Sequence, residues 1–310
     1  MITLPAWLVW LGTLMLVYPT TAAEVELATI GTFAPGVPPA VIWTARLHLE
    51  AGRESGPVTL RLVLDPAIWG DGTTTQFIPG VTEAYVRRQS AQAEVSAGVE
   101  RLPLEVGRLT IPFSVEPVDA LGLHAGVPGI RVALYPDNAT RLRLAAFEQD
   151  GLVRSLVSLR RQFATFEVEG HAVMLGRRTA IGLGGSGLVR SLVLYGEVWV
   201  LSAPAEWRYA VGVSGSIPNG LWTLEGGYAA PLPGQVPRHQ LAAELTRQAS
   251  PEIAWSISAR AFFDADGVRG QAGIELVRSF ASGDLTLTLA GQFGPGAPQA
   301  IVGAAIRLSL

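Results

Sequence analysis

Apolar and polar residues alternate with a period of two along most of the chain beyond residue 24, and helical periodicity is scarce. Successive side chains of a β-strand point to opposite faces, so this alternation predicts strands with one apolar and one polar face. The stretches are separated by Gly, Pro, Asn and Asp, which favour turns. The clearest stretches are 40–51, 57–64, 139–147, 163–174, 205–217, 252–263, 268–280, 284–293 and 300–310.

The length of these stretches favours a membrane barrel over a soluble sandwich. Most have about 10 to 13 residues, enough to cross a membrane at a strand tilt near 45°, whereas sandwich strands usually have about 5 to 6. Connections near the C-terminus also tend to alternate between short and longer Pro/Gly-rich segments, as at the two rims of a bacterial barrel. The short ones are Pro218–Gly220, Ser250–Pro251 and Ser282–Asp284; the longer ones are 231–237 and 294–299, although 264–267 is brief.

These observations predict an all-β fold, namely a transmembrane, antiparallel, up-and-down β-barrel of about 16 strands, within a range of about 14 to 18. The stretch 176–187 fits neither a short turn nor a clean strand. In lipid every outward side chain must be apolar, so the apolar face of each strand is expected to point outward. The residues expected to face lipid include Trp43, Leu47, Trp207, Val211, Trp255 and Ile257.

The N-terminus has the pattern of a secretory signal peptide. The apolar run Leu8–Tyr18 is followed by the small residues Thr20–Ala23, which predicts cleavage after Ala23 and a single barrel domain over 24–310. No Arg or Lys precedes the run, so a single N-terminal anchor helix is the competing interpretation. Beyond residue 24 no run of about 18 apolar residues follows, and we expect no transmembrane helix.

The composition narrows the function classes. The 310 residues carry a net charge of −3, which argues against nucleic acid as a partner bound through charge. No cysteine is present, which excludes disulfides, thiolate chemistry and Cys-ligated metal centres. Lysine is absent too, so all 23 basic side chains are arginine.

No residue pattern indicates an enzyme, a metal site or a cofactor. The histidines His48, His124, His171 and His239 lack the close spacing of a metal-binding motif. The run Gly182–Gly187 lacks the Lys of a phosphate-binding loop and is interpreted as a flexible turn. A hydrolase would need a nucleophile beside a base; His171 with Ser155, Ser158 or Ser191 is conceivable, but nothing in the sequence favours it. We therefore assign no catalytic residues and expect no cofactor.

The polar face of the strands holds the candidate functional residues. If the barrel is open, charged side chains on this face set the electric field inside it. In the alternative interpretation they pair with carboxylates, fill the lumen and make the barrel rigid. The arginines that we take as selectivity candidates are Arg46, Arg61, Arg141, Arg143, Arg208 and Arg260.

The segment 107–129 is a second candidate. It is long and rich in Pro and Gly, and it carries Arg108 and Asp119. A loop that folds into the lumen and narrows it would have this composition, and so would a plain loop at the rim. We name Arg108 and Asp119 as candidates for a constriction and leave the placement of the segment open.

Part of the chain resembles known bacterial barrels. Glu83–Val86 (EAYV), Val106–Arg108 (VGR), Ile111–Ser114 (IPFS) and Pro117–Asp119 (PVD) are similar to stretches of the phosphate-selective and alginate-export porins of Gram-negative outer membranes. The resemblance covers about a tenth of the chain and implies a porin-like barrel. Such barrels usually end in Phe or Trp, whereas this chain ends in Leu310.

The sequence thus predicts a porin-like channel in the cell outer membrane for passive diffusion of small solutes, with a preference for anions. The expected partners are outer-membrane lipid and the barrel-assembly machinery, and a homo-oligomer is left open. Two alternatives remain: a non-conducting barrel with a structural or anchoring role, and a secreted soluble β-protein. The solute, the exact number of strands and conduction itself do not follow from the sequence.

Overall fold

A computed structural model describes most of the chain. The described residues are 21–34, 37–71, 73–78, 80–104, 109, 113–114, 116, 125–202, 205–229, 238–264, 267–294 and 298–309. The predicted signal peptide therefore lies almost wholly outside the described residues. The first strand begins at Thr21, before the predicted cleavage site. In the described part of the chain, no helix is long and apolar enough to cross a membrane.

The described residues form one antiparallel sheet of twenty strands. The strands are β1 Thr21–Ala34, β2 Val37–Ser55, β3 Val58–Leu64, β4 Ala67–Gly70, β5 Thr75–Ile78, β6 Val81–Gln89, β7 Ala93–Glu100, β8 Val127–Asp137, β9 Thr140–Gln149, β10 Leu152–Gln162, β11 Phe166–Leu175, β12 Arg178–Val189, β13 Leu192–Ser202, β14 Ala205–Ile217, β15 Gly220–Ala229, β16 Arg238–Ser250, β17 Ile253–Asp264, β18 Gly267–Phe280, β19 Gly283–Phe293 and β20 Gln299–Ser309.

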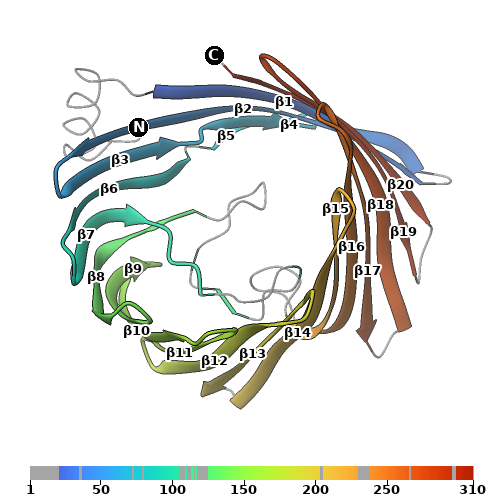
Figure 1. Cartoon of the computed structure of the whole chain (residues 1–310). Helices are drawn as coiled ribbons and strands as arrows, with labels where there is room; N and C mark the ends of the chain where they lie inside the picture. The colour runs from blue at the N-terminus through green and yellow to red at the C-terminus, as the bar shows by residue number, and fades with distance from the viewer. Residues whose placement is uncertain are drawn as a thin grey trace.

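The sheet closes into a barrel because its first and last strands pair. β1 and β20 are antiparallel partners from Glu24↔Ser309 to Phe33↔Ala300, and each strand in between pairs with its neighbours around the ring (Figure 1). Closure pairs the two ends of the sheet with each other, as a membrane-spanning sheet requires. The predicted all-β antiparallel barrel is confirmed.

One hairpin of the wall is interrupted on both of its strands. β2 pairs with β3 over Leu49–Ser55 and with β4 over Trp43–Arg46, so β3 and β4 share one position in the wall. β5 and β6 share the next position, because they pair with β4 and β3 respectively. The described wall therefore has 18 strand positions, the upper end of the predicted range.

The 18 positions lie within the predicted range and near the central estimate of about 16, and the Gly-rich stretch accounts for part of the difference. Gly182–Gly187 lies within β12, so its interpretation as a flexible turn was wrong. Glycines hide the apolar and polar alternation that marks a strand. At Gly182 the reason for glycine is steric, because an added Cβ would lie 2.6 Å from the indole of Trp199.

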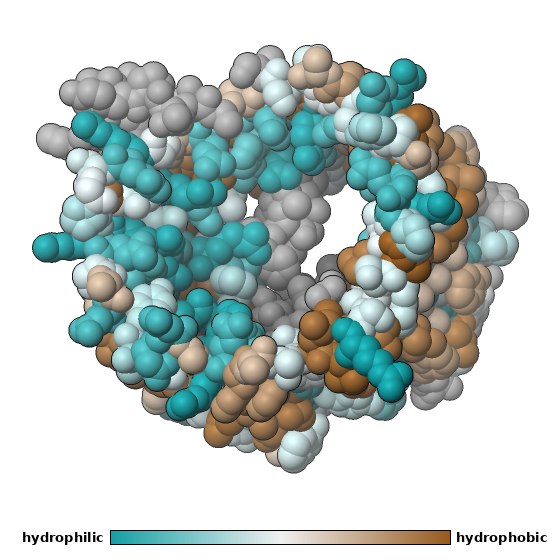
Figure 2. Space-filling model, in the orientation of Figure 1, coloured by the Kyte–Doolittle hydropathy of each residue, from teal (hydrophilic) through white to brown (hydrophobic). Residues whose placement is uncertain are grey.

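The two faces of the barrel differ as the alternation predicted. Large apolar side chains point outward and are exposed, among them Trp207 (64%), Val211 (58%) and Ile257 (43%). In Figure 2 apolar surface lies along the outer wall at the right and bottom of the view, while polar surface gathers at the rim and around the opening. An apolar band of this kind suits lipid rather than water.

The two rims also differ. Connections at the rim where β1 begins and β20 ends are two or three residues long, such as 218–219 between β14 and β15. The three longest connections, 101–126, 230–237 and 294–298, all lie at the opposite rim. The predicted contrast between the rims is confirmed, and the longest connection is the one that bears on function.

Candidate functional site: the lumen and the segment inside it

The connection 101–126 is here called the lumen segment, and its described residues lie inside the barrel. Leu102, Leu104 and Phe113 are buried in one apolar cluster with residues of β8 to β13. The ring of Phe113 lies 4.5 Å from that of Trp199, a fully buried β13 residue that points inward. In Figure 1 the coloured part of the segment that follows β7 runs inside the ring of strands. The described residues therefore lie in the lumen, as expected of a constriction rather than of a rim loop.

Polar contacts hold the lumen segment to several strands. Arg143 of β9 donates to the carbonyl of Pro103 (3.2 Å), and Arg101 pairs with Glu116 inside the segment (2.8 Å). Farther along, the Leu109 N–H donates to the Glu225 carboxylate and the Leu109 carbonyl accepts from Arg260. The two predicted constriction residues, Arg108 and Asp119, lie outside the described residues, and their role stays a prediction.

The six candidate arginines all point into the lumen, but the structure does not gather them into a cationic strip. Arg46 lies 2.7 Å from Asp65, and Arg208 lies 2.9 Å from Glu206. Arg61 contacts two carboxylates, Glu83 at 2.5 Å and Glu50 at 3.1 Å. Since a neighbouring carboxylate cancels most of the field of an arginine at a distance, these pairs favour the rigid-lumen interpretation.

Arg141 and Arg143 share one carboxylate. The closest guanidinium nitrogens lie 3.8 Å and 3.6 Å from Oε1 of Glu169 on β11. Ser158 on β10 donates to the same oxygen at 2.7 Å. Arg260 donates to the backbone carbonyl of Leu109, so it contacts the lumen segment, as Arg143 does through Pro103.

Buried acidic residues of the wall were not among the site residues predicted from the sequence. Glu94 and Glu100 on β7 are both buried and bind Arg87 and Arg131 from the two neighbouring strands. Glu225 is buried too. The alternation places each of them on the inner face, so parity alone would have found them. Strand parity does not predict which arginine each of these glutamates contacts.

The serine and histidine that a hydrolase would need face each other without forming a catalytic pair. Ser158 and His171 are cross-strand partners. The Ser158 hydroxyl is bonded to Glu169, however, and the His171 ring is buried and stacked on Trp199 with centroids 5.3 Å apart. Within the described part of the chain no group of three or more His, Asp or Glu residues is placed to hold a metal ion.

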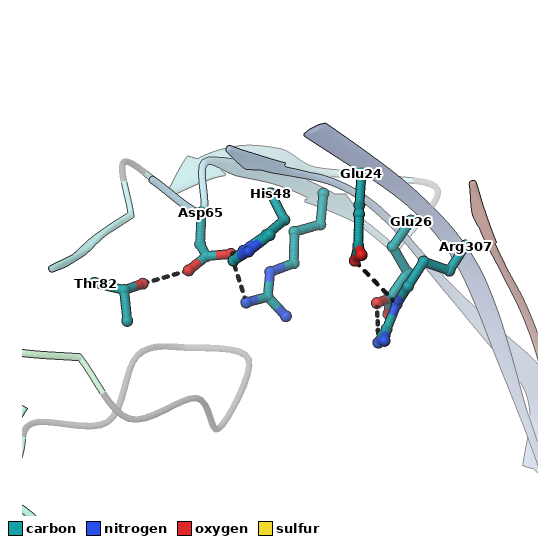
Figure 3. A network of polar contacts seen from close by, with 7 residues as sticks. Glu24, Glu26, His48, Asp65, Thr82 and Arg307 are labelled. Atoms are coloured by element: carbon teal, nitrogen blue, oxygen red, sulfur yellow. Dashed lines mark hydrogen bonds and ion pairs between the residues drawn. The ribbon is translucent and has the colours of Figure 1, made fainter. Parts of the chain in front are cut away.

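A network of charged residues lies on the inner wall where the barrel closes (Figure 3). Asp65 follows β3 and binds Arg46 and His48 of β2, each at 2.7 Å, and also Thr82 of β6. On the other side of β1, Arg307 pairs with Glu26 at 3.0 Å and lies 3.9 Å from Glu24. A cavity of about 250 Å³ lies between Glu24, Glu26, Arg46, His48 and Arg307.

A larger cavity lies beside this network. It has a volume of about 480 Å³ and is lined by the inner faces of β1, β18, β19 and β20, including Glu275 and Asp284. The apolar cluster of the lumen segment packs instead against β8 to β13. The lumen thus has a filled side and an open side, in line with the off-centre opening in Figure 2.

Comparison with known proteins shows the fold. No family model matches the chain, and no curated protein matches it in sequence. Among solved structures, it is similar to OpdQ of Pseudomonas aeruginosa, with 8% identity and a TM-score of 0.64 over 94% of this chain and 99% of that one. OccK1 (OpdK) of the same organism gives 11% identity and 0.64 over 94% and 98%, and OccAB4 of Acinetobacter baumannii gives 10% and 0.63 over 94% and 97%.

Another solved structure that is similar to this chain is described as an outer membrane protein, OpdK. At identities of 8 to 11%, the likeness shows the barrel fold alone. It does not support the phosphate-selective and alginate-export families that the local motifs resemble.

Proposed function

We propose that this chain forms a channel in the cell outer membrane through which small solutes diffuse passively. The observation that carries the proposal is the combination of a closed barrel, an apolar outer wall and a charged inner wall with an open side. Charged side chains on an inner wall need water or partners around them, and an open cavity beside them supplies the water.

The outer wall supports the membrane location over the soluble alternative. Exposed aromatic and aliphatic side chains recur on the outward face of strand after strand, as Phe77, Ile130, Met174, Leu183 and Leu289 illustrate. A soluble protein would expose this surface to water and aggregate. Outer-membrane lipid as a partner follows from the same surface, and export and insertion by barrel-assembly machinery remain part of the proposal.

The filled side gives the non-conducting alternative its support. Ten buried residues, three from the lumen segment and seven from the wall, pack together in one apolar cluster. An interior filled in this way would stiffen the barrel. The open side favours conduction, because the cavity along β18, β19, β20 and β1 is unfilled and its lining mixes charged residues and threonines with small and aliphatic residues.

Charge selectivity is the finer part of the proposal. The expected anion preference rested on arginines that the structure shows in pairs with carboxylates. Such pairs leave a smaller net field in a water-filled pore than unpaired arginines would, and salt screens what remains. We therefore propose a weakly selective pore with a small anion preference.

Planar-bilayer recording of the refolded full barrel tests the proposal. The expected result is discrete, ohmic current steps, together with swelling of liposomes in isotonic solutions of small neutral sugars. Heat-modifiable mobility on a gel identifies the folded barrel beforehand. A barrel that is folded by this criterion but gives neither current steps nor swelling would reject the channel and support the structural role.

A further inference from the structure

The backbone of one residue in the lumen segment is held from two directions. The N–H of Leu109 lies 3.2 Å from each carboxylate oxygen of Glu225 on β15. Its carbonyl oxygen lies 2.5 Å from Nη2 of Arg260 on β17. The anionic side chain meets the donor of the peptide and the cationic side chain meets the acceptor, so the two contacts suit the polarity of the backbone.

These contacts lie away from the other anchor of the segment. Leu102, Leu104 and Phe113 pack against β8 to β13, whereas Leu109 reaches β15 and β17. Apolar packing therefore fixes the two flanks of this residue to the filled side, and the two charged side chains fix Leu109 itself toward the open side. The position of Leu109 across the lumen depends on the second anchor.

We infer that Glu225 and Arg260 are positioning residues that hold Leu109 across the lumen and thereby set the width of the pore. The inference rests on the proposed channel function and deepens it, because it assigns the solute size limit to named residues. Arg260 then acts through its hydrogen bond to the Leu109 carbonyl, and not chiefly as a fixed charge that selects anions.

Hydrogen bonding and charge can be separated at both positions. Glu225→Gln keeps an acceptor for the Leu109 N–H and removes the charge, whereas Glu225→Leu removes both. Arg260→Lys keeps a donor, whereas Arg260→Met removes it. The expected result is a larger unitary conductance and a higher exclusion limit for Glu225→Leu and Arg260→Met, with both quantities close to wild type for Glu225→Gln and Arg260→Lys.

The exclusion limit is measured with polyethylene glycols of graded mass added to the bilayer chamber. Arg160 offers a matched control. It pairs with Glu167 on the inner wall, and among the described residues it makes no hydrogen bond or ion pair with the lumen segment. Arg160→Met removes one lumen arginine as Arg260→Met does, and it should leave the exclusion limit unchanged.

The outcomes separate the two proposals. A folded wild-type barrel without current steps rejects the channel itself. A conducting wild type whose exclusion limit does not change in Glu225→Leu or in Arg260→Met overturns the positioning role and leaves the channel standing. An exclusion limit that changes equally in Glu225→Gln and Glu225→Leu would assign the effect to charge and also overturn it.

Discussion

The carboxylate of Asp65 lies 2.7 Å from the guanidinium of Arg46, at the point where β3 ends and before β4 begins. Pro66 follows and has no N–H to donate, although its carbonyl accepts from the Leu47 N–H at 3.0 Å. The Asp65 side chain also binds Thr82 of the interrupted partner strand. One carboxylate thus links three wall positions where the ladder of backbone hydrogen bonds is broken.

Replacing Asp65 should therefore destabilise the barrel. Asp65→Ala leaves Arg46 and His48 without their carboxylate, and a half-buried pair of this kind is expected to cost about 1–3 kcal/mol of unfolding free energy. Urea unfolding of the barrel in lipid vesicles measures it. Asp150→Asn is the control, because it tolerates the φ of 56° at this turn and removes only an exposed pair with Arg154, which should contribute about 0–1 kcal/mol. Equal losses in the two variants would contradict the linking role.

The lipid-facing assignment predicts a dependence on residue parity. Ile257 is exposed on the outer wall and its neighbour Ser256 points inward. Ile257→Arg at mid-strand should cost about 2–4 kcal/mol of barrel stability, and Ser256→Arg much less, because only the first places a charge in lipid. The same unfolding assay compares them. Similar costs at both positions would refute the assignment of faces.

The close approach of Trp199 to β12 predicts a steric effect at one glycine. Gly182→Ala places a methyl group against the buried indole and should cost about 1–3 kcal/mol through overpacking. Gly170→Ala on β11 is the control, since its nearest neighbour would lie 4.0 Å away. The fluorescence of Trp199 reports the disturbance. Because the chain has 8 Trp, this signal is obtained as the difference between spectra recorded with and without the Trp199→Phe substitution. An unchanged spectrum and stability would contradict the packing.

Neutralising the paired arginines should shift charge selectivity toward cations. Arg141→Gln with Arg143→Gln leaves Glu169 without either guanidinium, so the fixed charge of the inner wall becomes more negative. The reversal potential in a salt gradient should move in the cation direction, and the shift should shrink as salt screens the wall. Glu169→Gln in the same background should reverse the shift. A reversal potential that stays the same after substitution of Arg141, Arg143 and Glu169 would show that these residues lie off the conducting path.

Much of the fold was predictable because strand parity is a local property. The outward position of Val211 and the inward position of Arg208 follow from their place in one alternating stretch. The Asn219–Gly220 sequence likewise predicts the hairpin between β14 and β15, where Asn219 adopts a φ of 59°. β12 escaped prediction because its glycines carry no pattern, and their reason lies on a neighbouring strand.

The candidate site was less predictable because it depends on distant contacts. The inner position of Arg260 follows from parity, but its hydrogen bond joins residues 151 positions apart in the chain. The composition of 107–129 allowed either a rim loop or a constriction. Only the contacts of Leu109 and Phe113 with β13, β15 and β17 distinguish them. Arg108 and Asp119 remain predictions.

The pairing of β1 with β20 has a consequence for the order of assembly. Glu26 and Arg307 meet across this seam although 281 positions separate them. Closing so long a loop is entropically the least favourable pairing in the sheet, whereas most of the hairpins close over a few residues. The seam should therefore form last, after the neighbouring hairpins have zipped together. Until then the growing sheet has two open edges able to pair with other chains, and the final step of folding is also the one that removes this hazard.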